Sequence, residues 1–379
     1  MRPAPVDPTG LAAALRPFGD SRMLPADAYT KSEVLDWEQR HLFAGSWTPL
    51  GRRAALASDG NQRAVTVGGI GVLLTFDGGV RAFANVCRHR GHELLGEGEA
   101  IDRPAVVCPY HGWSYTLDGR LRTAPRMGDA FDCSRLGLVE LPAIDWHGWV
   151  FVNASGGARP FASHIGALEG RVAPYRPERL VAKARHRYEV AANWKIIAEN
   201  YHECYHCALI HPELCAITPP NSGENWREPG AWVGGSMELR EHAATMSLDG
   251  RSDGVPLGGD VDPRIVRYVG LFPSLLISLH PDYVLTHRLE PLAPARTRVD
   301  CEWLFPAEVA DPSYAVEFWD ITNRQDWRAC ESVQRGVSSP HFVPGPLAPN
   351  ENAVYDWVTM IGRAYRDPLA ELGPITVDG

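Results

Sequence analysis

A run of metal-binding residue types lies in the middle of the chain, where residues 199–211 read ENYHECYHCALIH. Within it, His202, Glu203 and His206 form an H-E-x-x-H pattern, which is typical of zinc peptidases. The same run places Glu203, His206 and His211 at a spacing that suits a non-haem iron centre. The two interpretations use different ligands and predict different chemistry, either zinc-dependent hydrolysis or oxygen activation at iron.

The zinc interpretation lacks a third ligand. On an ideal helix His202 and His206 share a face, and Glu203 could act as the general base. The longer H-E-x-x-H-x-x-G-x-x-H pattern is absent, because residue 209 is leucine and residue 212 is proline. A five-residue pattern without its continuation is weak support for a peptidase.

The iron interpretation requires a break in the helix. We expect a helix over residues 193–210 that Pro212 ends, because the residue before a proline is displaced from the α region. On a straight helix His206 and His211 would lie about 140° apart, so they converge only if the helix is interrupted between them. One carboxylate would then complete a 2-His-1-carboxylate triad, which leaves positions open for oxygen and substrate.

A second set of metal-binding residues lies earlier, as Cys87-x-His89 and Cys108-x-x-His111. Two thiolates and two imidazoles from two loops are the ligands of a Rieske [2Fe-2S] cluster, with cysteines on one iron and histidines on the other. A structural zinc site is the alternative, but its ligand pairs are usually spaced Cys-x-x-Cys or His-x₃₋₅-His. We therefore interpret these residues as cluster ligands.

The two sets of metal-binding residues support each other's interpretation. A hydrolase needs no electron relay, whereas oxygen activation at a single iron requires electrons. A Rieske cluster therefore favours the iron interpretation of His206 and His211, and the H-E-x-x-H pattern becomes a coincidence of overlapping spacings.

The elements that must position these residues are mostly strands before residue 155, and strands, helices and loops after it. Asp77-Gly78-Gly79 and Asp118-Gly119-Arg120 predict hairpin turns. Apolar runs and alternation predict strands at residues 275–279 and 298–305, and residues 314–335 form a long helical candidate. The Gly, Pro and Asn residues of 215–263 favour loops that cover a substrate.

Composition limits the class of protein. The chain has 379 residues, 45% hydrophobic and 22% charged, with a net charge of −9 that argues against nucleic-acid binding. No apolar run has membrane-spanning length and the first residues lack a secretory signal, so we expect a cytoplasmic protein. Its eight cysteines favour metal ligation or burial over disulfides, and Cys204 and Cys207 are expected to pack on the helix.

The motifs resemble those of the catalytic (α) subunits of Rieske non-haem iron oxygenases. They are Cys-Arg-His-Arg-Gly at 87–91, Cys-Pro-Tyr-His-Gly-Trp at 108–113, Asn-Trp-Lys at 193–195 and the run from Glu199 to His206. The resemblance implies an α+β protein: an N-terminal helical segment (residues 1–44) on the catalytic domain, an all-β Rieske domain (45–155) and a catalytic domain (156–379). The catalytic domain is expected to have an antiparallel sheet with covering helices, in a helix-grip or START-like fold.

The resemblance also assigns roles. It implies that Asp326, on a late helix, is the third iron ligand beside His206 and His211. It implies a homotrimer in which His111 of one subunit bonds Glu203 of the next, and it places Asn200 in the electron path or near the iron.

The implied function is that of a terminal oxygenase, which uses O2 and electrons that a separate reductase or ferredoxin delivers from NAD(P)H. The motif sequences are most similar to those of enzymes that act on quaternary-ammonium compounds. This resemblance implies hydroxylation or oxidative N-demethylation of a small betaine-like substrate. Ring hydroxylation of an aromatic or polycyclic substrate is the alternative, and a zinc hydrolase is a distant one. A trimethylammonium group calls for an aromatic box, for which the candidates are Trp232, Tyr268, Phe272 and Trp319.

Overall fold

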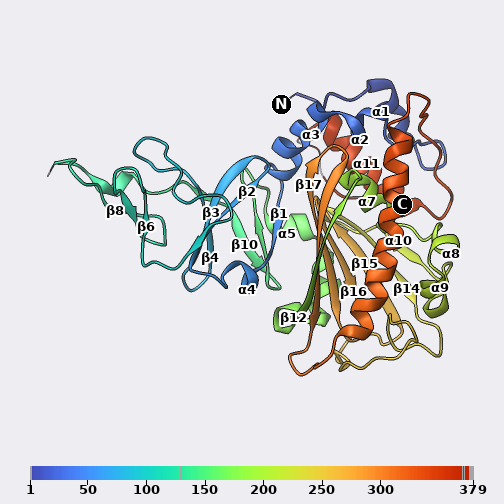
Figure 1. Cartoon of the computed structure of the whole chain (residues 1–379). Helices are drawn as coiled ribbons and strands as arrows, with labels where there is room; N and C mark the ends of the chain where they lie inside the picture. The colour runs from blue at the N-terminus through green and yellow to red at the C-terminus, as the bar shows by residue number, and fades with distance from the viewer. Residues whose placement is uncertain (1, 129, 369, 371, 375–379) are drawn as a thin grey trace. The chain divides into compact units, whose positions relative to one another are not determined.

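The chain folds into two compact units (Figure 1), seen in a computed structural model that describes residues 2–128, 130–368, 370 and 372–374. The smaller unit is Glu38–Phe161, and the larger combines Met1–Trp37 with Ala162–Gly379. The described N-terminal residues up to 37 therefore belong to the larger unit.

The smaller unit is built from short antiparallel strands. They form a five-stranded sheet in the order β5-β2-β3-β4-β9 and two three-stranded sheets, β1-β11-β10 and β6-β7-β8. Its elements are η1 (Gln39–Phe43), β1 (Thr48–Arg52), α4 (Arg53–Leu56), β2 (Gln62–Val67), β3 (Ile70–Phe76), β4 (Val80–Ala84), β5 (Ala100–Ile101), β6 (Val106–Val107), β7 (Ser114–Tyr115), β8 (Leu121–Thr123), η2 (Cys133–Arg135), β9 (Glu140–Leu141), β10 (Ala143–Trp146) and β11 (Trp149–Val152).

Both predicted hairpins are confirmed. Residues 77–79 join β3 to β4, and residues 118–120 lie between β7 and β8. Gly119 has a φ of +85°, and a Cβ atom there would lie 2.4 Å from the ring of Phe83. Only glycine therefore fits this turn without displacing a core side chain.

The larger unit is organised by a seven-stranded antiparallel sheet in the order β12-β18-β17-β16-β15-β14-β13. The predicted strand at 275–279 is confirmed with those bounds, and its five residues are all buried. Residues 215–263, expected to be loops, also contribute two strands, β13 and β14. The strands are β12 (Val181–Val190), β13 (Glu224–Trp226), β14 (Trp232–Glu238), β15 (Ile265–Leu271), β16 (Leu275–Leu279), β17 (Val284–Ala293) and β18 (Arg296–Phe305).

Helices cover this sheet. The long helix α10 lies across it and packs on α7 and β12, while α11 packs on α7 and β14 (Figure 1). No helix within the described residues is long and apolar enough to span a membrane. The helices are α1 (Pro8–Ala14), α2 (Asp27–Thr30), α3 (Ser32–Glu38), α5 (Phe161–Ile165), α6 (Leu168–Val172), η3 (Ala173–Tyr175), η4 (Pro177–Arg179), α7 (Trp194–Tyr201), α8 (Cys207–Ile210), α9 (Pro212–Ile217), α10 (Ser313–Val337) and α11 (Asn352–Arg366).

The single helix expected over residues 193–210 is wrong. Helix α7 ends at Tyr201, residues 202–206 form a turn, and α8 then runs to Ile210. His211 has left the α region, with φ −118° and ψ 71°, as expected before a proline. Pro212 nevertheless begins a helix, because the N–H that proline lacks has no partner in a first helical turn.

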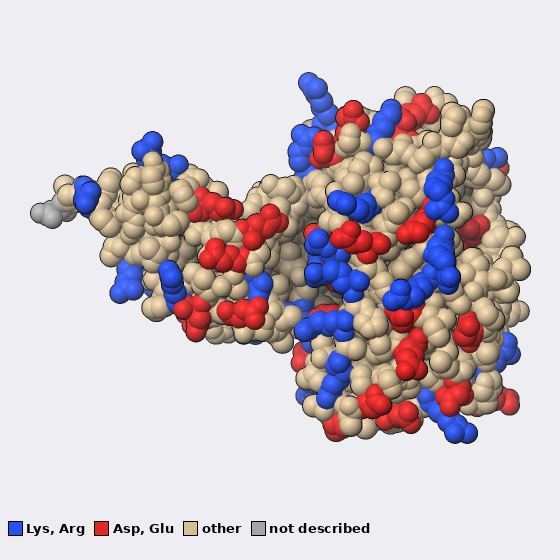
Figure 2. Space-filling model, in the orientation of Figure 1, with Lys and Arg blue, Asp and Glu red and all other residues tan. Residues whose placement is uncertain are grey.

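Charges of both signs alternate on the face of the larger unit that Figure 2 shows. On the edge strand β12, Arg185 pairs with Glu302 and Arg187 with Asp300, in each case directly opposite on β18. Pairs of this kind contribute about 0.2–1 kcal/mol each to a sheet.

A buried histidine should make stability depend on pH. His164 donates from Nε2 to the carbonyl of Phe272 at 2.9 Å, and burial lowers its pKa to about 4. The unfolded chain binds this proton at the ordinary pKa, so acid favours unfolding between the two values. The free energy of unfolding of wild type falls when the pH is lowered from 6 to 5. In His164→Gln this fall should be smaller by about 1 kcal/mol. Chemical denaturation at both pH values measures it.

The exposed His341 provides the control for this prediction. His341→Gln should leave the pH dependence of wild type unchanged. An unaltered pH dependence in His164→Gln would contradict the assignment of a neutral, buried imidazole.

Candidate active site

Three side chains from distant parts of the larger unit converge on one point. The ligand atoms of His206, His211 and Asp326 all lie within 4.8 Å of one another. His211 Nε2 lies 3.1 Å from His206 Nε2 and 2.9 Å from Asp326 Oδ1, and His206 Nε2 lies 3.3 Å from the same oxygen. The sequence prediction therefore named three residues that the fold brings together.

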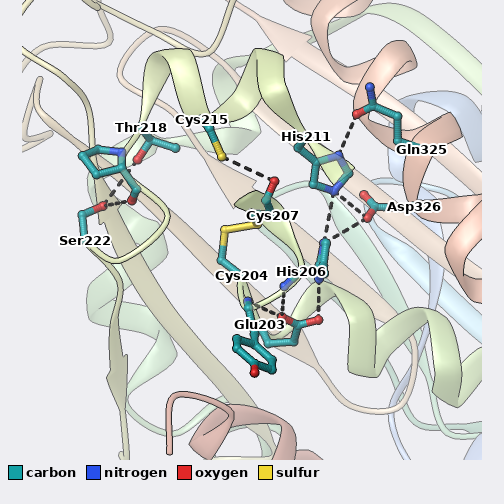
Figure 3. The surroundings of a disulfide bond; sticks show 12 residues. Glu203, Cys204, His206, Cys207, His211, Cys215, Thr218, Ser222, Gln325 and Asp326 are labelled. Carbon is teal, nitrogen blue, oxygen red and sulfur yellow. Dashed lines mark hydrogen bonds and ion pairs between the residues drawn. A yellow bond between two sulfur atoms is a disulfide. The ribbon is translucent and has the colours of Figure 1, made fainter. Parts of the chain in front are cut away.

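The two imidazoles are oriented through their other nitrogens (Figure 3). His206 donates from Nδ1 to Glu203 Oε1, and Glu203 Oε2 also accepts from the backbone N–H of His206 at 3.1 Å. His211 donates from Nδ1 to Gln325 Oε1 at 2.7 Å, and Gln325 in turn donates to Glu213 at 3.0 Å. Both Nε2 lone pairs therefore point at the common centre, as partners of metal ligands arrange them.

Gln325 and Glu213 were not predicted from the sequence. Gln325 directly precedes Asp326 on α10, and Glu213 lies in the first turn of α9. Neither belongs to a recognisable spacing, so only the fold reveals that they hold His211.

The electrostatics of this cluster favour a positive charge. Burial lowers the pKa of His206, but hydrogen bonds to Asp326 and Glu203 outweigh it and raise the pKa to about 9. Burial raises the pKa of Asp326, but the two imidazoles outweigh it and hold the pKa of this carboxyl below its usual value. A metal cation at the common centre supplies the charge that these carboxylates stabilise.

The donor set fits ferrous iron. Two imidazoles and one carboxylate are the 2-His-1-carboxylate set of non-haem iron oxygenases. His202, which the zinc interpretation requires, lies instead against Trp357 with its ring centroid 5.0 Å away, and burial lowers its pKa to about 3. The group of potential metal ligands that the larger unit brings together, His206, His211 and Asp326, does not include His202. The zinc-peptidase alternative is therefore wrong.

A small cavity of about 250 Å³ adjoins these residues, below the range of about 300–1,000 Å³ that is common for ligand sites. Of the four aromatic candidates, Tyr268 and Trp319 line it, whereas Trp232 and Phe272 are buried outside it. Asn200 also lines it. The lining further includes aromatic side chains that the sequence analysis did not single out, Tyr201, Trp327 and His287.

The aromatic walls are held in place by hydrogen bonds. Trp319 donates from Nε1 to the hydroxyl of Tyr283 at 2.7 Å, and Tyr201 shares a hydrogen bond with Ser278 at 2.9 Å. The hydroxyl of Tyr268 is buried and has no hydrogen-bond partner among the described residues.

The smaller unit brings its four predicted ligands together. Cys87 and Cys108 are buried, His89 is half-buried and His111 is exposed. The Nδ1 atoms of the two histidines lie 3.2 Å apart, and Tyr115 Oη lies 3.3 Å from Cys87 Sγ. Buried sulfurs and outward-facing imidazoles are the arrangement that a Rieske cluster requires, so these residues fit the cluster.

The family described as "Rieske [2Fe-2S] domain" matches residues 46–141. The family described as "Ring hydroxylating alpha subunit (catalytic domain)" matches residues 177–367, about half of the chain. The chain belongs to the ring-hydroxylating α subunits of Rieske oxygenases. As a Rieske oxygenase it uses a [2Fe-2S] cluster and a mononuclear iron.

Relatives of this Rieske oxygenase share most of its length. The glycine betaine monooxygenase oxygenase subunit of Chromohalobacter salexigens is 29% identical, over 93% of this chain and 89% of the relative. The crystal structure of the quaternary ammonium Rieske monooxygenase CntA with L-carnitine has a TM-score of 0.73 and 23% identity, covering 94% of this chain and 98% of that one. Naphthalene 1,2-dioxygenase from Rhodococcus sp. has a TM-score of 0.73 and 18% identity, covering 96% and 97%. The two structural likenesses show the fold.

One cysteine expectation is wrong. Cys204 and Cys207 do not pack as separate thiols but form a disulfide. The turn at residues 202–206 replaces the expected helix and brings their Cα atoms within 4.9 Å, which is within bonding range.

Replacing Asp326 should remove one metal ion and leave the cluster intact. Asp326→Ala deletes the carboxylate that the two imidazoles share, so the purified protein should lose about one iron of three per chain, with visible absorption unchanged. Iron analysis together with cluster absorption measures both sites.

Asp320→Asn is the matched control, because Asp320 is on the same helix but bonds Tyr188 and Arg324 instead. It should retain all the iron. Full iron in Asp326→Ala would contradict the ligand assignment.

Proposed function

We propose that this protein is the terminal oxygenase of a Rieske system that hydroxylates or oxidatively N-demethylates a small quaternary-ammonium, betaine-like substrate. We further propose that Cys87, His89, Cys108 and His111 hold the cluster, and that His206, His211 and Asp326 hold the iron. The observation that carries the substrate proposal is the aromatic lining of the cavity that adjoins the iron ligands.

The aromatic walls supply what a trimethylammonium group needs. Tyr201, Tyr268 and Trp319 line one small cavity, with ring centroids 6.0 Å apart for Tyr201 and Tyr268 and 6.4 Å apart for Tyr268 and Trp319. A cation within about 6 Å of such rings gains about 0.5–2 kcal/mol per favourable contact. Glycine betaine and L-carnitine, named for the relatives, both carry this group.

The charge of the lining is compatible with this substrate. The carboxylates of Glu203 and Asp326 balance the two charges of a ferrous ion, and the described lining residues include no lysine or arginine that would repel a cationic group. Asn221, Asn225 and Asn350 on the lining offer amide N–H groups to a carboxylate or hydroxyl at the other end of the substrate.

The residues of this chain orient and shield the chemistry. When bound, the iron supplies oxygen activation and the cluster supplies electrons. Glu203 and Gln325 keep both imidazoles in the tautomer that leaves Nε2 free, while the aromatic walls exclude water and place an N-methyl group beside the ligands.

The assembly is part of the proposal. We propose a homotrimer in which His111 of one subunit approaches Glu203 of the next, with Asn200 near the electron path and NAD(P)H oxidised by a separate reductase. Glu203 already bonds His206, so an electron that reaches its carboxylate is one hydrogen bond from an iron ligand.

A substrate screen tests the function. The protein, reduced through a reductase and supplied with O2, should convert betaines and release products in proportion to oxygen consumed. Turnover of aromatic acids but not of betaines would contradict the substrate class and support ring hydroxylation. Hydrolytic activity without reductant would contradict the oxygenase.

Removing one aromatic wall should weaken binding of the cation. In Trp319→Leu, the KM for a quaternary-ammonium substrate should rise about tenfold, because about 1–2 kcal/mol of cation–π attraction is lost. The dissociation constant of the neutral tert-butyl isostere should change far less. Steady-state kinetics and competitive inhibition by the isostere measure the two.

Trp232→Phe is the control, because Trp232 is buried on β14 outside the cavity. It should keep the KM of wild type. Equal losses for the cation and its isostere in Trp319→Leu would contradict the cage.

A further inference from the structure

The disulfide between Cys204 and Cys207 encloses an iron ligand. The bond closes a ring over residues 204–207, and His206 lies inside it (Figure 3). The ring occupies the turn between α7 and α8, where no continuous helix holds the backbone. The disulfide is therefore one of the restraints on the backbone of His206.

Other contacts also hold this turn. The backbone N–H of Cys207 donates to the carbonyl of Cys204 at 3.2 Å, within the ring itself. Glu203 accepts from the backbone N–H groups of Tyr205 and His206. On the far side, Cys215 of α9 donates from Sγ to the carbonyl of Cys207 at 3.4 Å. Without the disulfide, these bonds would hold the ring segment, of which Tyr205 is 63% exposed.

The sulfurs lie where a small oxidant formed at the iron would meet them. Cys204 and Cys207 both line the same cavity as His206, His211 and Asp326. If two electrons and two protons reduced O2 there without oxidation of a substrate, hydrogen peroxide would leave the site. Cys204 and Cys207 are the only cysteines among the described lining residues, and a thiol is a better nucleophile toward peroxide than a thioether.

We propose that Cys204 and Cys207 are a redox-active pair, which hydrogen peroxide oxidises to a disulfide that secures His206 and which an external dithiol reduces again. One thiol sulfur attacks the peroxide, so that an S–O bond forms, the O–O bond breaks and water leaves. The second thiol attacks this sulfenic sulfur, the S–S bond forms and a second water leaves. The two sulfurs together give up two electrons, and two thiols and one peroxide yield one disulfide and two waters.

The reverse step needs an external dithiol. One of its sulfurs attacks the disulfide and the other releases the mixed intermediate, so the protein regains two thiols and the reagent becomes a disulfide. Reduction removes the ring constraint, so the reduced protein should lose iron faster than the oxidised one. For a four-residue ring the chain-entropy relation corresponds to about a twentyfold difference.

The experiment compares oxidised and reduced holoenzyme. Protein treated with dithiol and desalted without oxygen should alkylate at both cysteines; after peroxide, the peptide that contains them should resist alkylation and be lighter by two hydrogens. A ferrous chelator should then remove the mononuclear iron about twentyfold faster from the reduced form. The absorption of the cluster, recorded throughout, reports that the protein stays folded.

Two variants separate this pair from the other cysteines. Cys204→Ser should release iron at the reduced rate whether or not peroxide was added. Cys133→Ser removes another half-buried thiol, in η2 of the smaller unit, and should respond as wild type does. Continued alkylation of both cysteines after peroxide, or equal iron loss from the two forms of wild type, would overturn the proposal. The wild-type comparison needs no variant to fold, and no substrate is involved.

Discussion

The geometry of the active site depends on the imidazole of His206, which contacts a carboxylate through each of its two ring nitrogens. His206 gives Nδ1 to Glu203, three residues earlier, and faces Asp326 with Nε2 across 3.3 Å. The first contact is local, but the second joins residues from distant parts of the catalytic domain and exists only because α10 packs on α7 over the sheet. The long-range fold therefore serves to bring one carboxylate to a pair of histidines that the local turn has already oriented.

That local turn also explains where sequence reasoning succeeded and where it failed. Predicted ligands that come in short spacings, such as Cys87 with His89, followed from residue types, whereas Asp326 followed from family resemblance. The end of α7 at Tyr201 could not, because no Gly or Pro marks it. Glu203 instead captures backbone N–H groups that a helix would have used, a competition between side chain and backbone that residue periodicity does not reveal.

The glycines of residues 215–263 led to a wrong prediction of secondary structure. Their number favours loops, yet Gly234 and Gly235 lie in strand β14 and line the cavity. A Cβ atom at Gly235 would lie 2.3 Å from the carbonyl of Glu224 on β13, and one at Gly234 would lie 2.8 Å from the carbonyl of Tyr268 on β15. These glycines allow close approach between strands rather than a turn, and sequence alone does not distinguish the two uses.

The H-E-x-x-H pattern shows why spacing is an incomplete description of a metal site. The pattern predicts a zinc site only if His202 and His206 share the face of one helix. Here α7 ends before His202, and the imidazole of His202 turns inward to Trp357. It packs so closely on Gly270 of β15 that a Cβ atom at residue 270 would clash with it. Glu203, the general base in a peptidase, instead becomes the partner that orients His206. Identical residues at identical spacing thus acquire different chemistry because the backbone leaves the helix one residue before the motif begins.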